Sequence, residues 1–310
     1  MKKKIFIDGK AGTTGLRREE RLCGRDDLEI ISLPEELRKD TEARRKIINE
    51  ADIVFLCLPD AAAIEAVSLV ENDSVVIIDA STAHRTNPDW AYGFPELSEE
   101  FEAKIKSSKR IAVPGCHASG FIALVYPLIR AGILSEDALL TAHSLTGYSG
   151  GGKSMIADYR SDDRSALLGA PRQYALGQGH KHLPEMTAIT GLKNAPVFCP
   201  IVADFYSGME VTVPLFKKQL KYGGIEEVKS ILKDAYNSSL ISYKEGCDEA
   251  GFASAGALSD KDSMQIEVYG NDERMILVAR YDNLGKGASG AAVECLNIVL
   301  GCEKTKTLEV

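Results

Sequence analysis

Short apolar runs alternate with helical segments over the first 115 residues, and this alternation constrains the fold more than any other feature. The runs expected to form strands occupy residues 3–8, 28–33, 52–59, 74–81 and 110–115. The run at 52–59 is almost continuously apolar, as expected for a strand buried on both faces. Strands and helices that alternate with short connections predict a parallel sheet with helices on both faces.

The pattern changes after residue 115. Runs at 210–216, 263–270 and 274–283 alternate apolar and polar residues or carry β-branched residues, and fewer helical segments separate them. They predict a mixed or antiparallel sheet. We therefore expect an α/β protein with two domains.

The first expected domain is a Rossmann-type dinucleotide-binding domain over residues 1–115. The second is an α+β catalytic and substrate domain over residues 116–284. The C-terminal helix, at about 285–310, is expected to pack back on the first domain. A chain of 310 residues is long enough for two ordinary domains.

Composition argues against several classes of function. The formal net charge is −8, and no basic patch is interleaved with aromatic residues, so we expect no nucleic-acid partner. The apolar run near the N-terminus ends at Asp8, too early for a signal peptide. The apolar segment 121–134 is too short to span a membrane and contains Pro127 and Arg130. We expect a cytoplasmic protein without a membrane partner.

The cysteines indicate a reducing compartment. There are seven, an odd number spread over the chain, which fits free thiols better than a disulfide framework. No C-x-x-C spacing occurs, so we expect no metal site.

A glycine-rich loop follows the first strand. Its G-x-x-G-x-x-G spacing lets the backbone approach a pyrophosphate, which then faces the N-terminus of the next helix. A tight strand-to-helix turn without a ligand is the alternative. The predicted cofactor-binding residues of this loop are Gly9, Gly12, Thr13, Thr14 and Gly15.

The end of the second strand bears on the choice of cofactor. NAD-binding folds usually place a carboxylate there to hold the ribose 2′-hydroxyl. Here the strand ends near Ser32, which can donate to a 2′-phosphate, and Arg17, Arg18 and Arg38 are close in sequence. These residues favour NADP, although Glu35 keeps NAD open.

Cys116 lies in "VPGCHASGF", between a strand and a helical apolar run. A thiol at a helix N-terminus meets free backbone amides and the positive end of the helix dipole, which favour the thiolate. The same amides can stabilise an oxyanion. Most free cysteines are small buried apolar residues, and we interpret the other six in this way. For Cys116 the turn favours a nucleophile.

A thiolate nucleophile needs an acid/base partner, and the chain has only five histidines. His180 and His182 flank Lys181 on a glycine-rich loop, and Glu185 follows as a residue that can orient one of the rings. A metal pair or two surface histidines are the alternatives. We predict that His180 does the proton work, because the glycines before it leave room for a substrate. His182 is expected to bind the substrate phosphate or brace the turn.

Six motifs together resemble those of the N-acetyl-gamma-glutamyl-phosphate reductase family, in its shorter form. They are "DASTAHR", "YGFPEL", "VPGCHASGF", "SLTGYSGGGKSM", "GHKHLPEM" and "DNLGKGASGAAVECLN". The resemblance covers nearly the whole chain. It implies a substrate and dimerisation domain of the semialdehyde dehydrogenase type and a homo-oligomer, either a dimer or a tetramer.

The resemblance also implies a reaction. The product is N-acetyl-glutamate 5-semialdehyde, made in arginine biosynthesis by NADPH-dependent reduction of an acyl phosphate. In that family the cysteine of P-G-C is the nucleophile, here Cys116, and H-x-H-x-P-E supplies the acid/base, here His180 or His182. The late "GKGASG" segment, with Gly287, is expected near the cofactor.

Two further side chains are candidates for binding the substrate. Ser119 would assist the amides near Cys116 in stabilising the oxyanion. Arg85 is a candidate for the substrate carboxylate, as are Arg160 and Arg164, although each of these arginines is also compatible with a solvated surface position.

Related enzymes remain alternatives, because fold and thiol chemistry are shared among them. The H-x-H-x-P-E segment favours the acetylglutamyl enzyme over aspartate-semialdehyde dehydrogenase, but it does not exclude the aminoadipate-pathway homologue. A non-catalytic nucleotide-sensing protein is a further alternative. Cys116 and the two histidines argue against it, since a sensor needs none of them.

Overall fold

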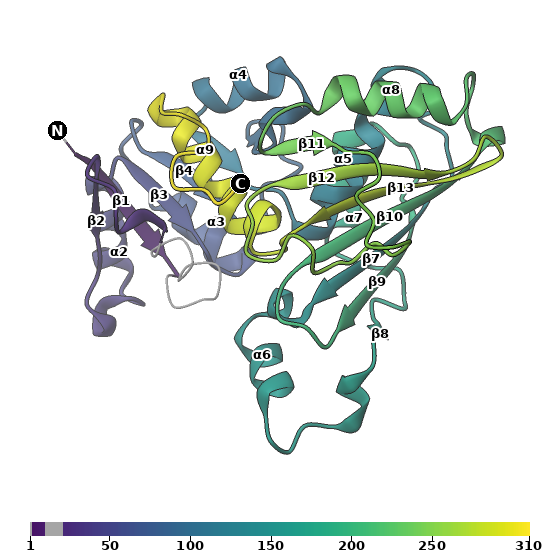
Figure 1. Cartoon of the computed structure of the whole chain (residues 1–310). Coiled ribbons are helices and arrows are strands. Elements are labelled where there is room, and N and C mark those ends of the chain that lie inside the picture. Colours follow the sequence, from purple (N-terminus) through teal and green to yellow (C-terminus); the bar gives the residue numbers. More distant parts are fainter. Residues whose placement is uncertain (1, 10–20) are drawn as a thin grey trace. The chain divides into compact units, whose positions relative to one another are not determined.

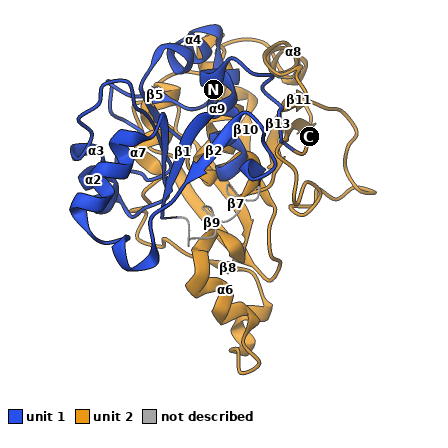
Figure 2. Cartoon of the chain, turned by 90° about the vertical axis from the view of Figure 1, so that its left-hand side faces the viewer, with its two compact units in different colours: residues 1–114, 288–308 blue, residues 115–287, 309–310 orange. Residues whose placement is uncertain are grey.

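The computed structural model describes residues 2–9 and 21–310, and the chain divides into two compact units (Figure 2). Unit 1 contains Met1–Pro114 and Ala288–Leu308, and unit 2 contains Gly115–Gly287 and Glu309–Val310. Several residues expected near the cofactor lie outside the described residues, namely Gly12, Thr13, Thr14, Gly15, Arg17 and Arg18.

Unit 1 is built on a parallel sheet, as the alternating pattern predicted. In the described residues this sheet has six strands, in the order β2-β1-β3-β4-β6-β5, and each pair runs parallel. The strands are β1 (Lys3–Asp8), β2 (Leu28–Ile31), β3 (Ile53–Leu56), β4 (Val76–Asp79), β5 (Ala91–Tyr92) and β6 (Arg110–Ala112).

Helices cover both faces of this sheet (Figure 1). They include α2 (Thr41–Glu50), α3 (Asp60–Ser68), α4 (Glu99–Ser107) and α9 (Gly290–Leu300). Because successive strand residues point to opposite faces, alternate residues enter two separate cores. The core under α2 and α3 includes Phe6, Val54, Leu56, Ile48 and Ala63. The core under α4 and α9 includes Ile7, Phe55, Ile105, Val293 and Leu296.

Unit 2 contains the mixed sheet that the second half of the sequence predicted. Its seven described strands have the order β11-β12-β13-β10-β7-β9-β8. Two pairs, β7 with β9 and β11 with β12, are parallel, and the others are antiparallel. The strands are β7 (Thr141–Gly147), β8 (Arg172–Gln173), β9 (Val197–Ala203), β10 (Met209–Phe216), β11 (Ile241–Tyr243), β12 (Met264–Gly270) and β13 (Arg274–Tyr281).

The central helix of unit 2 is α5 (Cys116–Arg130), which packs on β10 and β13 and contacts α7 (Leu183–Thr190) and α8 (Ile225–Ala235). Its residues are buried from His117 to Leu128. A glycine permits this close packing. A Cβ atom at Gly120 would lie 2.7 Å from the Tyr281 hydroxyl and 2.7 Å from Cγ2 of Val211. The sheet therefore supports the helix whose first residue is Cys116.

Candidate active site

The helix α5 begins at Cys116, so the thiol stands at a helix N-terminus as the sequence predicted. Gly115 precedes it in an extended conformation, with φ −77° and ψ 144°. The first-turn N–H groups of a helix lack intrahelical acceptors, and together with the helix dipole they favour an anion at this end. The half-buried Cys116 sulfur thus meets both conditions for a reactive thiolate.

Glu185 fixes the turn that leads into Cys116. Its carboxylate is buried in the first turn of α7, and its two oxygens accept the Gly115 N–H at 3.1 and 3.3 Å. Hydrogen bonds to an ionised acceptor are stronger than neutral ones. Through these bonds Glu185 holds the backbone before the thiol, and the expected contact of Glu185 with an imidazole stays a prediction.

Tyr281 holds the next part of the same turn. Its hydroxyl donates to the Cys116 carbonyl oxygen at 2.5 Å and accepts the Gly120 N–H at 3.0 Å. Burial, and then the nearby charge of Cys116, raise the pKa of Tyr281 well above its usual value. The hydroxyl therefore stays protonated and remains a donor to the helix.

The structure brings His180 and His182 together and adds His117 to them. Ring centroids of His117 lie 5.5 Å from those of both other rings, and those of His180 and His182 are 4.8 Å apart. Burial, then electrostatic interaction with His180 and Lys181, lower the pKa of His117 to about 3. Burial, then Lys181, lower the pKa of His180 to about 4. Both rings are therefore neutral near pH 7.

The loop that carries His180 is held in an unusual backbone conformation. Ala175 and Gln178 have φ of 51° and 55°, a left-handed region that non-glycine residues seldom adopt. The Gln178 amide binds the backbone of Phe198 on β9 twice, as donor and acceptor, at 2.8 Å each. Strained residues of this kind persist where surrounding contacts hold them, often at functional sites.

A backbone contact also selects the tautomer of His180. The His182 N–H donates to Nδ1 of His180 at 3.2 Å. A neutral ring whose Nδ1 accepts carries its hydrogen on Nε2. His182 itself is the N-cap residue of α7 and is buried. The two histidines thus differ in position, since one lies on the loop and the other begins a helix.

A hydrogen-bonded group around His117 was not predicted from the sequence. Nδ1 of His117 lies 2.6 Å from Oγ of Ser144 on β7, and Nε2 lies 2.7 Å from the Tyr174 hydroxyl. Burial, then the charge of Cys116, raise the pKa of Tyr174. The sequence shows only that His117 adjoins Cys116. No spacing rule links it to residues 144 and 174.

Ser119 and Gly287 also lie close to the Cys116 turn. Ser119 is buried, and its hydroxyl donates to the Gly115 carbonyl oxygen at 3.1 Å. A Cβ at Gly287 would lie 3.1 Å from Cβ of Cys116. Gly287 belongs to a π-helical segment, Gly285–Ser289, an element common at functional sites. The backbone at residue 287 therefore approaches Cys116 closely, and a side chain there would require its neighbours to shift by a few tenths of an ångström.

Arg85, the candidate for the substrate carboxylate, lies in unit 1 and is buried. Its Nε and Nη2 donate to the carbonyl oxygens of Val113 and Ala80, both at 2.9 Å. These bonds fix the plane of the guanidinium and join the segments that follow β4 and β6. Any contact of Arg85 with substrate stays a prediction.

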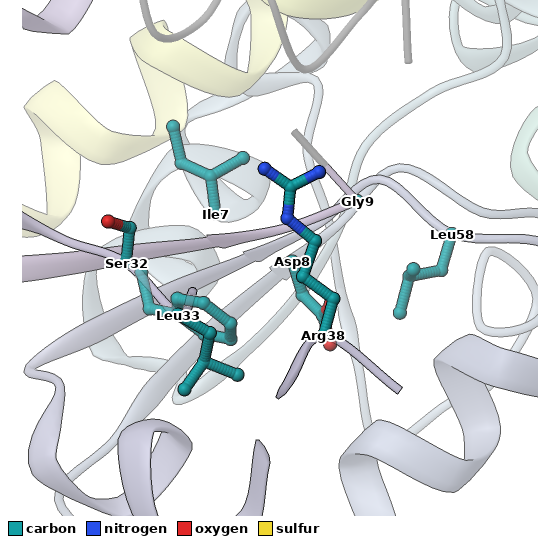
Figure 3. A pocket seen from close by; sticks show the side chains of 8 residues that line it. Ile7, Asp8, Gly9, Ser32, Leu33, Arg38 and Leu58 are labelled. Carbon is teal, nitrogen blue, oxygen red and sulfur yellow. The ribbon is translucent and has the colours of Figure 1, made fainter. Parts of the chain in front are cut away.

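A pocket in unit 1 lies at the carboxyl ends of β1, β2 and β3, where doubly wound folds bind nucleotides (Figure 3). It is lined by Phe6, Ile7, Asp8, Gly9, Ser32, Leu33, Arg38 and Leu58. Gly9 has φ 85°, and a Cβ there would meet the Cys57 carbonyl oxygen at 2.4 Å, so only glycine fits. The described part of the glycine loop suits close approach of a dinucleotide.

Two polar side chains of this pocket, Ser32 and Arg38, suit a nucleotide phosphate. Asp8 is buried and bound by Arg44 at 2.9 Å, and burial raises the pKa of Asp8 despite this partner. Ser32 and Arg38 also line the pocket, and Nη1 of Arg38 lies 3.4 Å from Oε1 of Glu35. A hydroxyl and a guanidinium are groups that bind phosphate.

Two further features can be stated for residues 2–9 and 21–310. None of their helices is long and apolar enough to cross a membrane. No three or more of their His, Cys, Asp or Glu side chains gather in an arrangement that could hold a metal ion. The expectation of no metal remains a prediction.

Comparison with known proteins first defines the class. The family model "Semialdehyde dehydrogenase, NAD binding domain" matches residues 23–105, and "Semialdehyde dehydrogenase, dimerisation domain" matches residues 116–283. The crystal structure of aspartate semialdehyde dehydrogenase II from Vibrio cholerae has the same fold, with a TM-score of 0.73 and 17% identity, covering 97% of this chain and 99% of that one. The two units are those of the semialdehyde dehydrogenases, and the predicted fold class is confirmed.

Curated relatives then define the family. N-acetyl-gamma-glutamyl-phosphate reductase from Sinorhizobium medicae is 46% identical over 308 residues, covering 97% of this chain and 99% of the relative. The enzyme of that name from Trichormus variabilis is 44% identical over 314 residues, covering 97% of each. The chain belongs to the N-acetyl-gamma-glutamyl-phosphate reductase family, which confirms the resemblance found in the motifs.

Proposed function

We propose that this chain reduces N-acetyl-glutamyl 5-phosphate to N-acetyl-glutamate 5-semialdehyde with NADPH, as a cytoplasmic enzyme of arginine biosynthesis. One observation carries the proposal. Cys116 begins α5 beside a cluster of three histidine rings, in a chain similar to N-acetyl-gamma-glutamyl-phosphate reductases over nearly its whole length.

Cys116 performs the first chemical step. Its thiolate attacks the acyl carbon, the carbon–oxygen bond to phosphate breaks, and a thioester forms. The first-turn amides of α5 stabilise the oxyanion of this step. Glu185 acts by fixing Gly115, and Ser119 acts through its bond to the same residue. These contacts keep the amides in place before the substrate arrives.

Reduction of the thioester is the second step. NADPH, when bound, supplies the hydride. We assign the acid/base role to His180, because its resting tautomer presents an N–H at Nε2 that can donate to the oxygen of the tetrahedral intermediate. As the carbon–sulfur bond breaks, the oxygen returns its proton to His180, the aldehyde is released and the Cys116 thiolate is restored. His182 sets the tautomer of His180 through its backbone N–H and braces the start of α7.

We assign cofactor binding to residues 1–115 with the C-terminal helix, and catalysis to residues 116–284. The chain has an NAD-binding family domain, and the polar groups of its pocket support NADP in particular. Ser32 and Arg38 would hold the 2′-phosphate, and Gly9 to Gly15 would hold the pyrophosphate. Gly287 would admit the cofactor near Cys116, and Arg85 would bind the substrate carboxylate.

The match of residues 116–283 to a dimerisation domain supports a homo-oligomer. We infer a dimer or a tetramer. Light scattering on the purified chain distinguishes these states, and a monomer at micromolar concentration would contradict the inference.

Activity is best tested in the oxidative direction. Phosphate-dependent reduction of NADP should be fastest with N-acetyl-glutamate semialdehyde and much slower with aspartate or aminoadipate semialdehyde. The Cys116→Ser variant serves as the control for thiol-dependent turnover. A higher kcat/KM with another semialdehyde would identify that compound as the substrate instead. Turnover that does not depend on phosphate would refute the proposed reaction.

A further inference from the structure

The Tyr281 hydroxyl has two backbone partners near the start of α5, and the mechanism above does not use it. It donates to the Cys116 carbonyl oxygen at 2.5 Å and accepts the Gly120 N–H at 3.0 Å. In a regular α-helix each N–H donates to the carbonyl oxygen four residues earlier, so these two backbone groups would bond to each other. The hydroxyl therefore bridges a pair of groups that a helix normally bonds directly.

The packing of unit 2 fixes this phenol in place. Tyr281 ends β13 and is fully buried, and its backbone pairs with Met209 on β10 and Met264 on β12. Two glycines make room for its side chain. A Cβ atom would lie 2.7 Å from the hydroxyl oxygen at Gly120 and 3.4 Å from Cε2 of the ring at Gly287. The strand and the close backbone around it leave the hydroxyl little freedom to move.

The carbonyl that accepts from Tyr281 belongs to the same peptide unit as the His117 N–H. In a planar trans peptide the C=O and N–H bonds point in opposite directions. The His117 N–H lies in the first turn of α5, where N–H groups have no acceptor within the helix. Hydrogen bonds in series polarise one another, so donation to the Cys116 oxygen makes the His117 N–H a stronger donor. The bond from Gly120 to the hydroxyl acts in the same direction.

We propose that Tyr281 is a positioning residue that strengthens the His117 N–H as a donor to the oxyanion formed at Cys116. This rests on the proposed function, in which Cys116 is the nucleophile and the first-turn amides of α5 stabilise the oxyanion. Negative charge develops on that oxygen only as the tetrahedral intermediate forms. A stronger donor therefore lowers the barrier to reaction more than it improves substrate binding, and its loss acts on kcat rather than on KM.

The test is the kinetics of Tyr281→Phe in the full-length chain. Turnover of N-acetyl-glutamate semialdehyde is followed with NADP and phosphate, and kcat and KM are determined separately. Loss of a whole oxyanion donor lowers kcat by roughly 10²–10³. Here the donor is weakened and not removed, so kcat should fall roughly 3–10-fold. KM should change by less than about twofold.

Tyr236→Phe is the matched control. Tyr236 is also buried, and its hydroxyl donates to the Ala123 carbonyl oxygen of the same helix at 2.9 Å. Ala123 lies about two turns beyond Cys116, so its peptide is not part of the first turn. This variant loses a similar buried hydrogen bond to α5, and its kcat should stay at the wild-type value.

The outcomes separate this inference from the proposed function. An unchanged kcat in Tyr281→Phe, a larger change in KM than in kcat, or an equal fall in kcat in Tyr236→Phe overturns the inference and leaves the proposed function standing. If Tyr281→Phe does not fold, an unchanged kcat in Gly120→Ala, whose Cβ would displace the same hydroxyl, overturns it. A wild-type chain without turnover of this semialdehyde refutes the proposed function itself.

Discussion

Replacing Gly120 by alanine should destabilise unit 2 and disturb the turn that carries Cys116. The new Cβ would lie 2.7 Å from the Tyr281 hydroxyl and 2.7 and 2.8 Å from Cγ2 and Cβ of Val211. Contacts under 3.0 Å force a shift. The Tyr281 hydroxyl that must move is the one bound to the Cys116 carbonyl oxygen and to the Gly120 N–H.

The expected loss of stability combines two unfavourable contributions and one favourable contribution. Overpacking of a tight core costs about 1–3 kcal/mol, and weakening the two Tyr281 hydrogen bonds costs about 1–2 kcal/mol together. Alanine regains about 1 kcal/mol over glycine inside a helix. The free energy of unfolding should therefore fall by about 1–4 kcal/mol, so steric conflict outweighs helix propensity.

Urea unfolding of the variant and the wild type measures this loss. The alkylation rate of Cys116 reports the disturbance of the turn. Gly169→Ala is the control, since no heavy atom beyond the adjacent residues lies within 4 Å of a Cβ at that position. Its free energy of unfolding should change by less than about 0.5 kcal/mol.

A double-mutant cycle identifies the cause. In a Tyr281→Phe background the hydroxyl is absent, so Gly120→Ala should cost less than it does in the wild type. The reasoning is refuted if Gly120→Ala leaves stability unchanged or raises it. An equal cost in both backgrounds would show that the Tyr281 hydroxyl is not the conflicting group.

Four further predictions concern the site. Cys116→Ser should abolish turnover but leave NADPH binding, measured by fluorescence titration, intact, because serine is a poor nucleophile without a strong base; near-normal activity would end the thioester mechanism. His180→Asn should lower kcat by roughly 10²–10⁴, and His182→Asn should mainly raise KM; the reverse result at saturating substrate exchanges the two roles. Wild type should show a higher kcat/KM with NADP than with NAD, and Arg38→Ala should reduce that ratio roughly tenfold or more; an unchanged ratio removes Arg38 from the 2′-phosphate site. Stability should fall as pH decreases from about 6.5 toward 3, because unfolded imidazoles then bind protons that the folded His117, with its pKa lowered to about 3, does not. For that ring the free energy of unfolding should fall by about 1.4 kcal/mol per pH unit. If the urea midpoints of wild type and His117→Asn change equally with pH between 4 and 6.5, the prediction is contradicted.

The sequence alone determined the parts of this protein that depend on local pattern. Hydrophobic runs separated by helical segments specify the parallel sheet of unit 1, because burial on both faces requires continuous apolar strands. Local sequence also determines the helix N-terminus at Cys116, because Pro114 and Gly115 directly precede an apolar run. Local sequence therefore places the Cys116 thiol at a helix N-terminus, where we propose that it acts as the nucleophile.

Only the tertiary structure decided which distant side chains surround the turn at Cys116. Glu185 reaches the Gly115 N–H across 70 residues, and His117 meets Ser144 and Tyr174 across 27 and 57 residues. These contacts arise where α5, α7 and the strands of unit 2 pack together. Such packing has no sequence period, because the partners are chosen by shape and hydrogen bonding in three dimensions. The helix N-terminus at Cys116 is thus predictable from its own turn, while the side chains around that turn depend on the packing of the whole unit.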